Sequence, residues 1–406
     1  MKIVQINANY NRSSIGRTTS ELHKWLLEHG HDSYVFTSQE DAFGNHVYHI
    51  GNQCDHKIHG LISRLLGLQG YASYFATRRM IRQLHLIDPD VVHLRNLHGN
   101  YINLPLLFQY LSKNNVNTVV TNHDCWLMTG HCTHPIHHIC EKWYTGCHHC
   151  PAMKFDNVSW LFDTSRKCYN DKKKWLSGIE RIASIGNSQW TTEQIRNSYM
   201  KNATIVEHIY NWIDDTVFYP RGTVDIRKRL GLSDNDFVIL GVCDGWAENK
   251  GLSIFGKIAQ RVPRWKIVLV GGVAHSAVVP AGVTMVDKTH NNDELCEYYT
   301  MADVLINPSK AETFGKVSAE ALCCGTPVIV NNATANPEIV GPGCGFVVED
   351  NNLEQYVQYI VHIETQGKSA YSATCIDFAH KQFNKEAIIL QYVGLYNRML
   401  NIKVNQ

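Results

Sequence analysis

The hydrophobic positions of the chain follow two alternating spacings, one typical of buried strands and one typical of helices. Short, nearly continuous apolar runs predict strands at residues 2–7, 33–37, 89–94, 117–122 and 182–185, and then at 237–241, 266–272, 302–307 and 327–330. Helical spacing over 18–29, ended by Gly30, predicts the first helix, and a polar loop is expected before it at 8–17. Strands that alternate with helices indicate parallel sheets covered on both faces.

The strand pattern stops after 182–185, which we take as the last strand of the first half, and starts again at 237–241. The segment 208–220 between them is an expected hinge, and 406 residues are enough for two or three domains. We therefore expect an α/β domain over 1–200, a second over 201–384, and a closing segment over 385–406, helical at 385–400, that packs back toward the first domain.

Composition narrows the class of protein without changing this picture. The chain is 44% hydrophobic and 18% charged, and its net charge of +1 argues against broad binding of nucleic acid. It has no apolar run long enough to cross a membrane, and its first residues predict a strand rather than a signal peptide. We therefore expect a cytoplasmic protein, whose 13 cysteines are thiols or metal ligands rather than disulfides.

The most informative segment is 311–322, Ala-Glu-Thr-Phe-Gly-Lys-Val-Ser-Ala-Glu-Ala-Leu, which places Glu312 and Glu320 eight residues apart. A predicted strand precedes it, and Gly325 and the proline that follows end the helix after it. A strand that leads through a loop into a helix start is a common place for phosphate to bind. Glu320 shares a helical stripe with apolar neighbours, so we expect its side chain to face inward.

This segment, with the Gly-Thr-Pro-Val-Ile that begins at Gly325, resembles the Glu-x7-Glu signature of retaining nucleotide-sugar glycosyltransferases of family four. The resemblance implies the GT-B fold, which has two Rossmann-like domains facing an interdomain cleft. It implies that Glu320 accepts hydrogen bonds from the donor ribose and that Glu312 approaches the transferred sugar. The backbone amides of Phe314, Gly315, Lys316 and Val317 would hold phosphate or sugar, and no catalytic divalent metal is expected.

Two further loops resemble the family's donor-binding parts. Lys250 follows the predicted strand 237–241, where the family has a Lys-Gly pair that contacts the diphosphate. Family members often carry an arginine five or six residues earlier, but here those positions are Gly245 and Asp244, so Lys316 is a candidate substitute. Gly16 lies in the N-terminal loop that resembles the one facing the donor phosphates, where glycine permits close approach of the backbone.

Polar residues that follow two strands of the first half are candidates for the sugar and acceptor side. The family places a His-Asp pair where His123 and Asp124 follow the strand 117–122, although a histidine at a strand end is often structural. The segment after 89–94 supplies the acceptor-pocket candidates Asn96, His98 and Asn103, for which ordinary loop polarity is the competing explanation.

The segment 123–155 is unusually rich in cysteine and histidine. Its Cys147-x2-Cys150 spacing is half of a zinc site, which Cys132 and Cys140 could complete. Free buried thiols or a disulfide are the alternatives. The segment resembles an insert found in family members of the colanic-acid and exopolysaccharide type, and a zinc ion there would be structural.

Residues 57–82 mix apolar and basic side chains, and Lys172, Lys173 and Lys174 extend the basic character. Such a segment can lie on an anionic membrane surface, although a helix that packs on its own sheet has a similar pattern. We therefore list peripheral contact with the inner face of the cytoplasmic membrane as an expectation.

Together these patterns favour a retaining glycosyltransferase that moves a sugar from a nucleoside diphosphate sugar to a saccharide acceptor carried on polyprenyl diphosphate, in bacterial surface polysaccharide synthesis. The first alternative is a nucleotide-sugar epimerase on the same scaffold, which needs no acceptor. Another is a non-catalytic partner of a glycosyltransferase complex, and a third is a zinc-stabilised interaction module confined to 123–155. The pattern does not say whether the donor base is that of UDP or GDP, nor which sugar moves.

Overall fold

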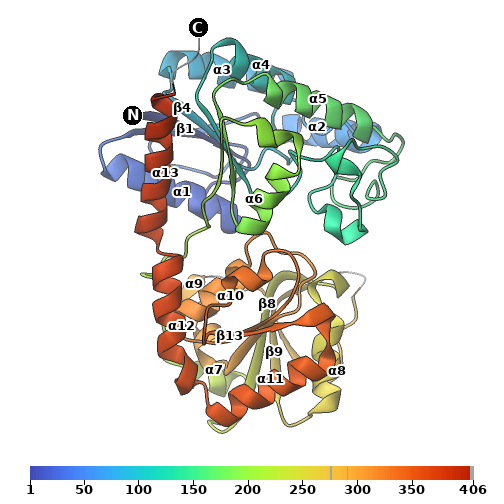
Figure 1. Ribbon diagram of the computed structural model, residues 1–406, viewed down its shortest axis with the longest axis vertical. Coiled ribbons are helices and arrows are strands. Elements are labelled where there is room, and N and C mark those ends of the chain that lie inside the picture. The colour runs from blue at the N-terminus through green and yellow to red at the C-terminus, as the bar shows by residue number, and fades with distance from the viewer. Residues whose placement is uncertain (275–276, 290, 403–406) are drawn as a thin grey trace. The chain divides into compact units, whose positions relative to one another are not determined.

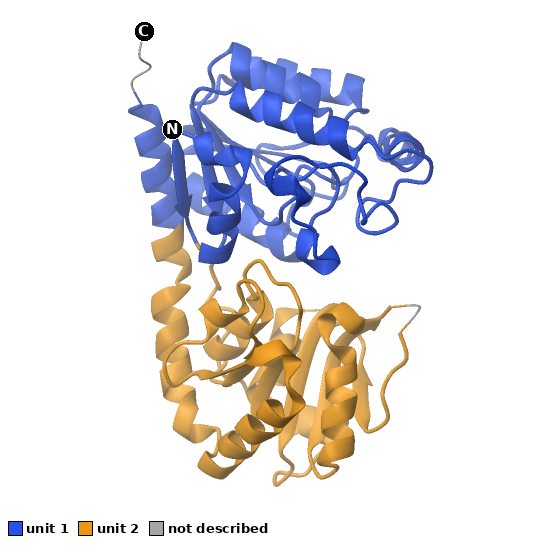
Figure 2. Ribbon diagram, turned by 45° about the vertical axis from the view of Figure 1, so that its right-hand side comes forward, with its two compact units in different colours: residues 1–209, 389–406 blue, residues 210–388 orange. Residues whose placement is uncertain are grey.

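The computed structural model describes residues 1–274, 277–289 and 291–402, and the chain forms two compact units. Unit 1 comprises residues 1–209 and 389–406, and unit 2 comprises residues 210–388 (Figure 2). The sequence-based division placed its boundaries at 200 and 384 rather than at 209 and 388. Residues 403–406 of the expected closing segment lie outside the described residues.

Unit 1 is built on a seven-stranded sheet in the order β3-β2-β1-β4-β5-β6-β7, and every neighbouring pair is parallel. Its strands are β1 (Lys2–Asn7), β2 (Asp32–Thr37), β3 (Val47–His49), β4 (Val91–Leu94), β5 (Thr118–Asn122), β6 (Ile182–Gly186) and β7 (Ile205–His208). Its helices are α1 (Ser13–Glu28), α2 (Gln53–Leu66), α3 (Tyr74–Ile87), α4 (Leu104–Lys113), α5 (Ser165–Ser177) and α6 (Gln189–Arg196). Figure 1 shows α3, α4 and α5 along one face of the sheet and α1 and α6 on the other.

Unit 2 has a six-stranded parallel sheet in the order β10-β9-β8-β11-β12-β13. Its strands are β8 (Val238–Trp246), β9 (Lys266–Val273), β10 (Val283–Val286), β11 (Val304–Asn307), β12 (Val328–Asn331) and β13 (Gly345–Val348). The helices are α7 (Val224–Arg229), α8 (Leu252–Arg261), α9 (Asn292–Met301), α10 (Lys316–Cys323), α11 (Leu353–Gln366) and α12 (Ser369–Gln382). Two parallel α/β sheets confirm the fold class predicted from the alternating pattern.

The last helix, α13 (Lys385–Leu400), begins in unit 2 and ends in unit 1. In unit 1 it supplies two buried tyrosines to the sheet. His93 of β4 lies 2.8 Å from the Tyr396 hydroxyl through Nδ1 and 2.8 Å from Thr121 Oγ1 through Nε2, and Thr121 Oγ1 lies 3.2 Å from the Tyr392 hydroxyl. The polar groups that β4 and β5 bury on this face are therefore satisfied by the final turns of the chain.

Several boundaries differ from the prediction. The loop expected at 8–17 is wrong, because α1 begins at Ser13 and includes Gly16. The strand 182–185 is not the last of its sheet, because β7 follows at the edge with a half-polar sequence that gives little apolar signal. The edge strands β3, β10 and β13 were missed because they are only three or four residues long, too short for a periodic pattern.

Three buried histidines of unit 1 make its stability depend on pH. Burial lowers the pKa of His59 to about 4, that of His123 to about 3, and that of His93 well below the ordinary value. In the unfolded chain these groups take up protons near pH 6.5, so the unfolded state binds more protons below that pH. Stability is therefore complete above about pH 6.5 and falls by about 1.4 kcal/mol per pH unit for each such histidine on acidification toward its folded pKa.

The prediction is checked by the urea midpoint of unit 1 between pH 7.5 and pH 5, which should fall steeply. His59→Gln should flatten this dependence, whereas the same change at the exposed His49 should not. A midpoint that does not change with pH would show that these imidazoles are protonated in the folded protein.

Candidate active site

The residues of the Glu-x7-Glu segment and the predicted diphosphate lysine meet at the carboxyl ends of the central strands of the unit 2 sheet, an edge of the sheet that runs across all of its strands. Lys250 follows β8 and Glu312 follows β11, and these two strands are parallel neighbours. Lys250 Nζ lies 2.6 Å from Glu312 Oε1 and 3.4 Å from Ser309 Oγ. The sheet therefore brings together two charged groups that are 62 positions apart in the sequence.

The ion pair keeps the lysine charged in a partly buried place. Burial alone would lower the pKa of Lys250, but the neighbouring Glu312 carboxylate outweighs that effect, so the pKa is raised. Both side chains keep part of their surface exposed, with relative accessibilities of 30% and 22%. The pair is thus accessible to an anionic ligand, which could share the lysine as a point charge.

The loop that carries Glu312 is held by hydrogen bonds to neighbouring loops. The backbone N–H of Glu312 donates to Thr334 Oγ1 at 2.8 Å, and the Thr334 hydroxyl donates to the Glu312 carbonyl at 2.7 Å. The backbone N–H of Lys310 donates to the carbonyl of Asn249 at 3.0 Å, next to Lys250. Ser309 and Thr334 were missed in the sequence because a hydroxyl in a loop carries no signal of its partner.

Two glycines make this close packing feasible. Gly251 has φ +73°, and a Cβ there would lie 2.6 Å from Pro308 Cβ. Gly315 has φ +87° and precedes the first residue of α10, a position for which glycine has no steric penalty. Gly315 has no side chain with which to cap α10, so the positive end of the helix dipole is presented at this edge with Lys316 and Val317 in its first turn.

Glu320 is buried, with 4% of its surface exposed, as the helical stripe predicted. The Tyr299 hydroxyl of α9 donates to its Oε2 at 2.8 Å, and Lys316 Nζ lies 3.8 Å from its Oε1. Tyr299 is itself buried, and the Thr326 hydroxyl donates to its carbonyl at 2.6 Å. Tyr299 therefore orients the carboxylate, a role that its place in an ordinary helical pattern did not reveal.

Tyr299→Phe should raise the KM for a nucleotide-sugar donor several-fold and leave kcat nearly unchanged. The change removes one hydrogen bond to a charged group, worth about 1.5–3 kcal/mol at most, and frees the Glu320 side chain to rotate. Steady-state kinetics with Tyr298→Phe as the matched control test this, because the Tyr298 hydroxyl faces Arg229 instead. Equal donor KM values in the two variants would remove Tyr299 from the site.

Phe314 differs from its neighbours in the segment because its side chain belongs to the core of unit 2. Its ring lies against those of Tyr210 and Phe383, with centroid separations of 6.1 and 5.3 Å. Burial of the ring anchors the segment ahead of α10, so only the backbone of Phe314 is available to a ligand.

In unit 1, four predicted residues gather where β4 and β5 end. Asn96, His98, His123 and Asp124 line one cavity together with Arg95, which the sequence pattern did not single out. The buried Arg95 guanidinium donates to Gln5 Oε1 at 3.2 Å and to Thr18 Oγ1 at 3.0 Å. Burial, assisted by the charge of Arg95, lowers the pKa of His123 to about 3, so this imidazole is neutral at pH 7.

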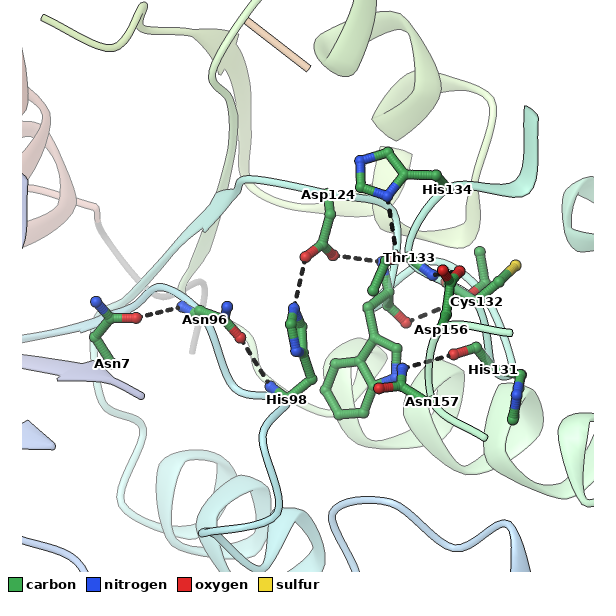
Figure 3. Close-up of polar contacts among 12 residues, drawn as sticks. Asn7, Asn96, His98, Asp124, His131, Cys132, Thr133, His134, Asp156 and Asn157 are labelled. Carbon is green, nitrogen blue, oxygen red and sulfur yellow. Dashed lines mark hydrogen bonds and ion pairs between the residues drawn. The ribbon is translucent and has the colours of Figure 1, made fainter. Parts of the chain in front are cut away.

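A chain of polar contacts fixes the partly exposed His98 (Figure 3). The Asn96 side-chain oxygen accepts from the His98 backbone N–H at 3.1 Å, and the Asn96 backbone N–H donates to Asn7 Oδ1 at 3.1 Å. His98 Nε2 lies 2.8 Å from Asp124 Oδ2, while the backbone N–H of Trp126 donates to Asp124 Oδ1 at 2.7 Å. Burial raises the pKa of Asp124, but the charge of His98 and these hydrogen bonds outweigh it and lower the pKa to about 2.

Two predicted residues of unit 1 have structural contacts. Asn103 caps α4, since its side-chain oxygen accepts from the Leu106 N–H at 3.1 Å and its amide nitrogen donates to the Tyr71 carbonyl at 2.5 Å. These contacts give Asn103 a structural role at the start of α4. Gly16 lies in α1, where a Cβ would be 3.1 Å from Asn9 Cβ, so glycine lets the helix approach the preceding loop.

The four cysteines of the predicted zinc site are free and lie in one region of unit 1. Burial raises the pKa of Cys132, and the nearby sulfurs of Cys150, Cys147 and Cys140 add to the effect. The Gly130 backbone N–H donates to Cys147 Sγ at 3.1 Å, a contact that favours a thiolate. Within residues 1–274, 277–289 and 291–402, however, no three His, Cys, Asp or Glu side chains are arranged to hold a metal ion. The cysteines would have to rearrange to bind zinc, and a structural zinc ion stays a prediction.

Elemental analysis of the purified protein tests that prediction, with about one zinc per chain expected. Replacing Cys147 and Cys150 together with serine should remove the metal and lower thermal stability, whereas Cys54→Ser, at an exposed cysteine outside the cluster, should change neither. A metal-free protein in which a thiol reagent titrates all four cysteines would contradict it.

Comparison with known proteins places the chain in a family. The family model "Glycosyltransferase Family 4" matches residues 15–217, which is half of the chain, and the model "Glycosyl transferases group 1" matches residues 225–381. The N-acetyl-alpha-D-glucosaminyl L-malate synthase of Bacillus anthracis is 24% identical over 48% of this chain and 54% of its own length. WcaC of Escherichia coli, named as a glycosyl transferase of colanic acid biosynthesis, is 20% identical over 77% of each chain.

Among solved structures, Anabaena Alr3699/HepE in complex with UDP and glucose matches with a TM-score of 0.67. It is 18% identical, and the match covers 98% of this chain and 100% of that one, which shows the fold alone. The chain spans about half the length of the curated relatives that it matches first. Half of the chain nevertheless fits one family model, and this chain belongs to glycosyltransferase family 4.

Proposed function

We propose that the protein is a retaining glycosyltransferase that transfers a sugar from a nucleoside diphosphate sugar to a saccharide acceptor. The observation that carries the proposal is the contact of 2.6 Å between Lys250 and Glu312 at the sheet edge where α10 begins, with Glu320 buried on the same helix. A positive charge and a helix N-terminus suit the diphosphate of such a donor, and carboxylates accept hydrogen bonds from its hydroxyl groups.

The proposed roles follow from the chemistry of the bond that breaks. Cleavage of the bond between sugar and phosphate leaves negative charge on the departing diphosphate, and in this proposal Lys250 and the amides of Phe314 to Val317 stabilise it. Glu320, held by Tyr299, accepts hydrogen bonds from the ribose hydroxyls. Glu312 lies beside the lysine and approaches the transferred sugar, whose configuration is kept if the acceptor attacks from the face that the leaving group vacates.

On the acceptor side we propose the cluster at the ends of β4 and β5. The neutral His123 contacts the transferred sugar, and His98, oriented by Asp124, binds an acceptor hydroxyl together with Asn96. The leaving phosphate oxygen takes the proton of the attacking hydroxyl, so that no residue of the chain has to act as the base. Asp124 then positions His98, and its low pKa keeps it charged over the whole physiological range.

Relatives support a class of substrate rather than a particular one. WcaC is named for colanic acid biosynthesis, a 34% identical relative over 30% of its length comes from the cps region of Klebsiella pneumoniae, and Alr3699/HepE was solved with UDP and glucose. We propose a donor with a nucleoside diphosphate, an acceptor saccharide carried on polyprenyl diphosphate, and a role in surface polysaccharide synthesis. For such a lipid-linked acceptor, we propose that the enzyme works in the cytoplasm at the inner face of the membrane. None of the described helices is long and apolar enough to cross that membrane.

The test begins with the binding of UDP and GDP, followed by the sugar nucleotides of the base that binds. The donor is then incubated with the protein alone and with a lipid-linked saccharide fraction. Transfer that needs the acceptor and keeps the anomeric configuration, read by NMR, is the expected result. Epimerised sugar or free sugar formed from donor alone would replace the proposal with an epimerase, and binding without any turnover would indicate a non-catalytic partner.

A further inference from the structure

Helix α2 leaves a large part of its apolar stripe exposed to solvent, unlike an ordinary surface helix. The residues it buries are His59 and Ser63, whereas Ile58 and Leu61 are each more than half exposed and Leu66 is also exposed. The polar side is held in place, because His59 contacts Ser73 Oγ at 2.8 Å through Nδ1 and accepts from the Gly70 N–H at 3.1 Å. A helix that only packed on its own sheet would bury most of its apolar side chains, Ile58 and Leu61 included.

A second apolar segment lies at the end of this helix. Trp160, Leu161 and Phe162 are consecutive, and each has more than half of its surface exposed. Their backbone is pinned, since the Trp160 N–H donates to the Arg64 carbonyl at 2.6 Å and the Ser159 hydroxyl donates to the Phe162 carbonyl at 2.7 Å. The three side chains therefore project into solvent from a fixed backbone.

Helix α2 contacts the segment 160–162 directly at the start of that segment, and it contacts the chain again just after the segment. The Thr164 hydroxyl donates to the carbonyl of Gly67, the residue that ends α2, at 2.7 Å. A Cβ at Gly67 would meet Thr164 Oγ1 at 2.6 Å and the Phe162 carbonyl oxygen at 2.9 Å, so the chain passes very close to the helix end. We call the exposed set the docking surface: Lys57, Ile58, Leu61, Arg64, Leu66, Trp160, Leu161 and Phe162.

Basic residues outnumber acidic ones on α2 and on two other helices of unit 1, although the exposed Asp163 directly follows Phe162. Helices α2, α3 and α5 together contain ten lysine and arginine residues but only two aspartates, Asp55 and Asp171, and no glutamate. The whole chain has a net charge of only +1, so the excess is local to these helices. Lys57 and Arg64 lie exposed on α2 itself, beside the apolar side chains.

We propose that the docking surface binds the face of an anionic phospholipid bilayer, with the apolar side chains in the interfacial layer and the basic ones at the lipid phosphates. Exposed apolar residues that include an aromatic ring, with basic residues beside them, are the composition that suits this boundary, because the basic side chains are attracted to the lipid phosphates. Two copies of the chain that met through this surface would oppose like charges, which disfavours self-association. The proposal rests on the proposed function only for its purpose, which is to bring the enzyme to a lipid-linked acceptor.

The test is sedimentation of the purified full-length protein with vesicles of phosphatidylcholine, with and without phosphatidylglycerol. Binding is expected only with the anionic lipid and should weaken with added salt. Replacing Trp160, Leu161 and Phe162 together with serine should lower the partition coefficient at least about tenfold, because three large apolar side chains are then no longer buried in the interfacial layer. Lys57→Gln with Arg64→Gln should lower it about tenfold as well.

Phe43→Ser is the matched control, since Phe43 is an exposed aromatic of unit 1 outside the docking surface, and it should bind like the unchanged protein. All variants should keep their circular dichroism spectrum and their affinity for nucleotide. Equal binding to neutral and anionic vesicles, or undiminished binding by both variants, would overturn the proposal. The proposal would also be overturned if the protein does not bind vesicles and forms a dimer in solution that the serine substitutions convert to a monomer. If the unchanged protein binds anionic vesicles but transfers no sugar, only the proposed function is contradicted.

Discussion

Lys250→Ala is expected to lower kcat/KM for sugar transfer by at least about tenfold while unit 2 stays folded. Hydrogen bonds that involve a charged partner are worth about 1.5–3 kcal/mol, and the one from Lys250 to a leaving diphosphate grows stronger as the bond breaks. The loss should therefore appear in kcat as well as in KM. Lys257→Ala, at an exposed lysine of α8, is the matched control and should leave both constants unchanged.

Glu312→Ala should produce a loss of similar size, because Lys250 then lacks the partner that holds it 2.6 Å away. Since the two groups form one pair, the double variant should lose much less than the product of the two single losses. Circular dichroism and thermal melts establish that each variant is folded. Near-normal turnover of both single variants would remove the donor site from this edge of the sheet.

Glu320→Ala is expected to raise the KM for the nucleotide-sugar donor by about tenfold to a hundredfold, with a smaller change in kcat. The carboxylate is buried, and its proposed partners are ribose hydroxyls that do not react. Its loss also leaves the buried Tyr299 hydroxyl without its acceptor, so the melting temperature should fall.

Glu320→Gln separates these two effects, since the amide keeps an oxygen for Tyr299 but no longer carries the charge. We expect an intermediate donor KM and nearly normal stability. Glu354→Gln, at an exposed glutamate of α11, serves as control. The measurements are donor titrations by calorimetry and steady-state kinetics, and unchanged donor affinity in Glu320→Ala would contradict the assignment.

The sequence predicted the periodic parts of the fold well and the contacts between distant residues poorly. The central strands and the helix at 385–400 were predicted because apolar spacing is strong there, whereas β3, β10 and β13 are edge strands of only three or four residues. The inward orientation of Glu320 also followed from helical spacing alone. The ion pair of Lys250 with Glu312 could not be predicted from spacing, because it depends on β8 and β11 being neighbours in the sheet.

The spacing of apolar residues in the sequence also could not show which face of a helix is buried. The pattern of α2 marks an amphipathic helix, but an apolar face looks the same in the sequence whether it is buried or exposed. Only the structure shows that α2 buries His59 and Ser63 while Ile58 and Leu61 remain exposed. Tyr299 and Arg95 were missed for a similar reason, because their roles depend on partners that lie far away in the sequence.

The path of α13 has a consequence for synthesis of the protein on the ribosome. Unit 1 begins with the first residues made but takes Tyr392 and Tyr396 from the last. Until α13 has been synthesised, His93 of β4 lacks the Tyr396 hydroxyl that it contacts in the folded protein. Unit 1 is therefore the first unit to emerge but cannot complete its folding until the end of synthesis. A nascent chain released at residue 388 should therefore bind chaperones and succumb to proteases, even though both of its sheets are fully encoded.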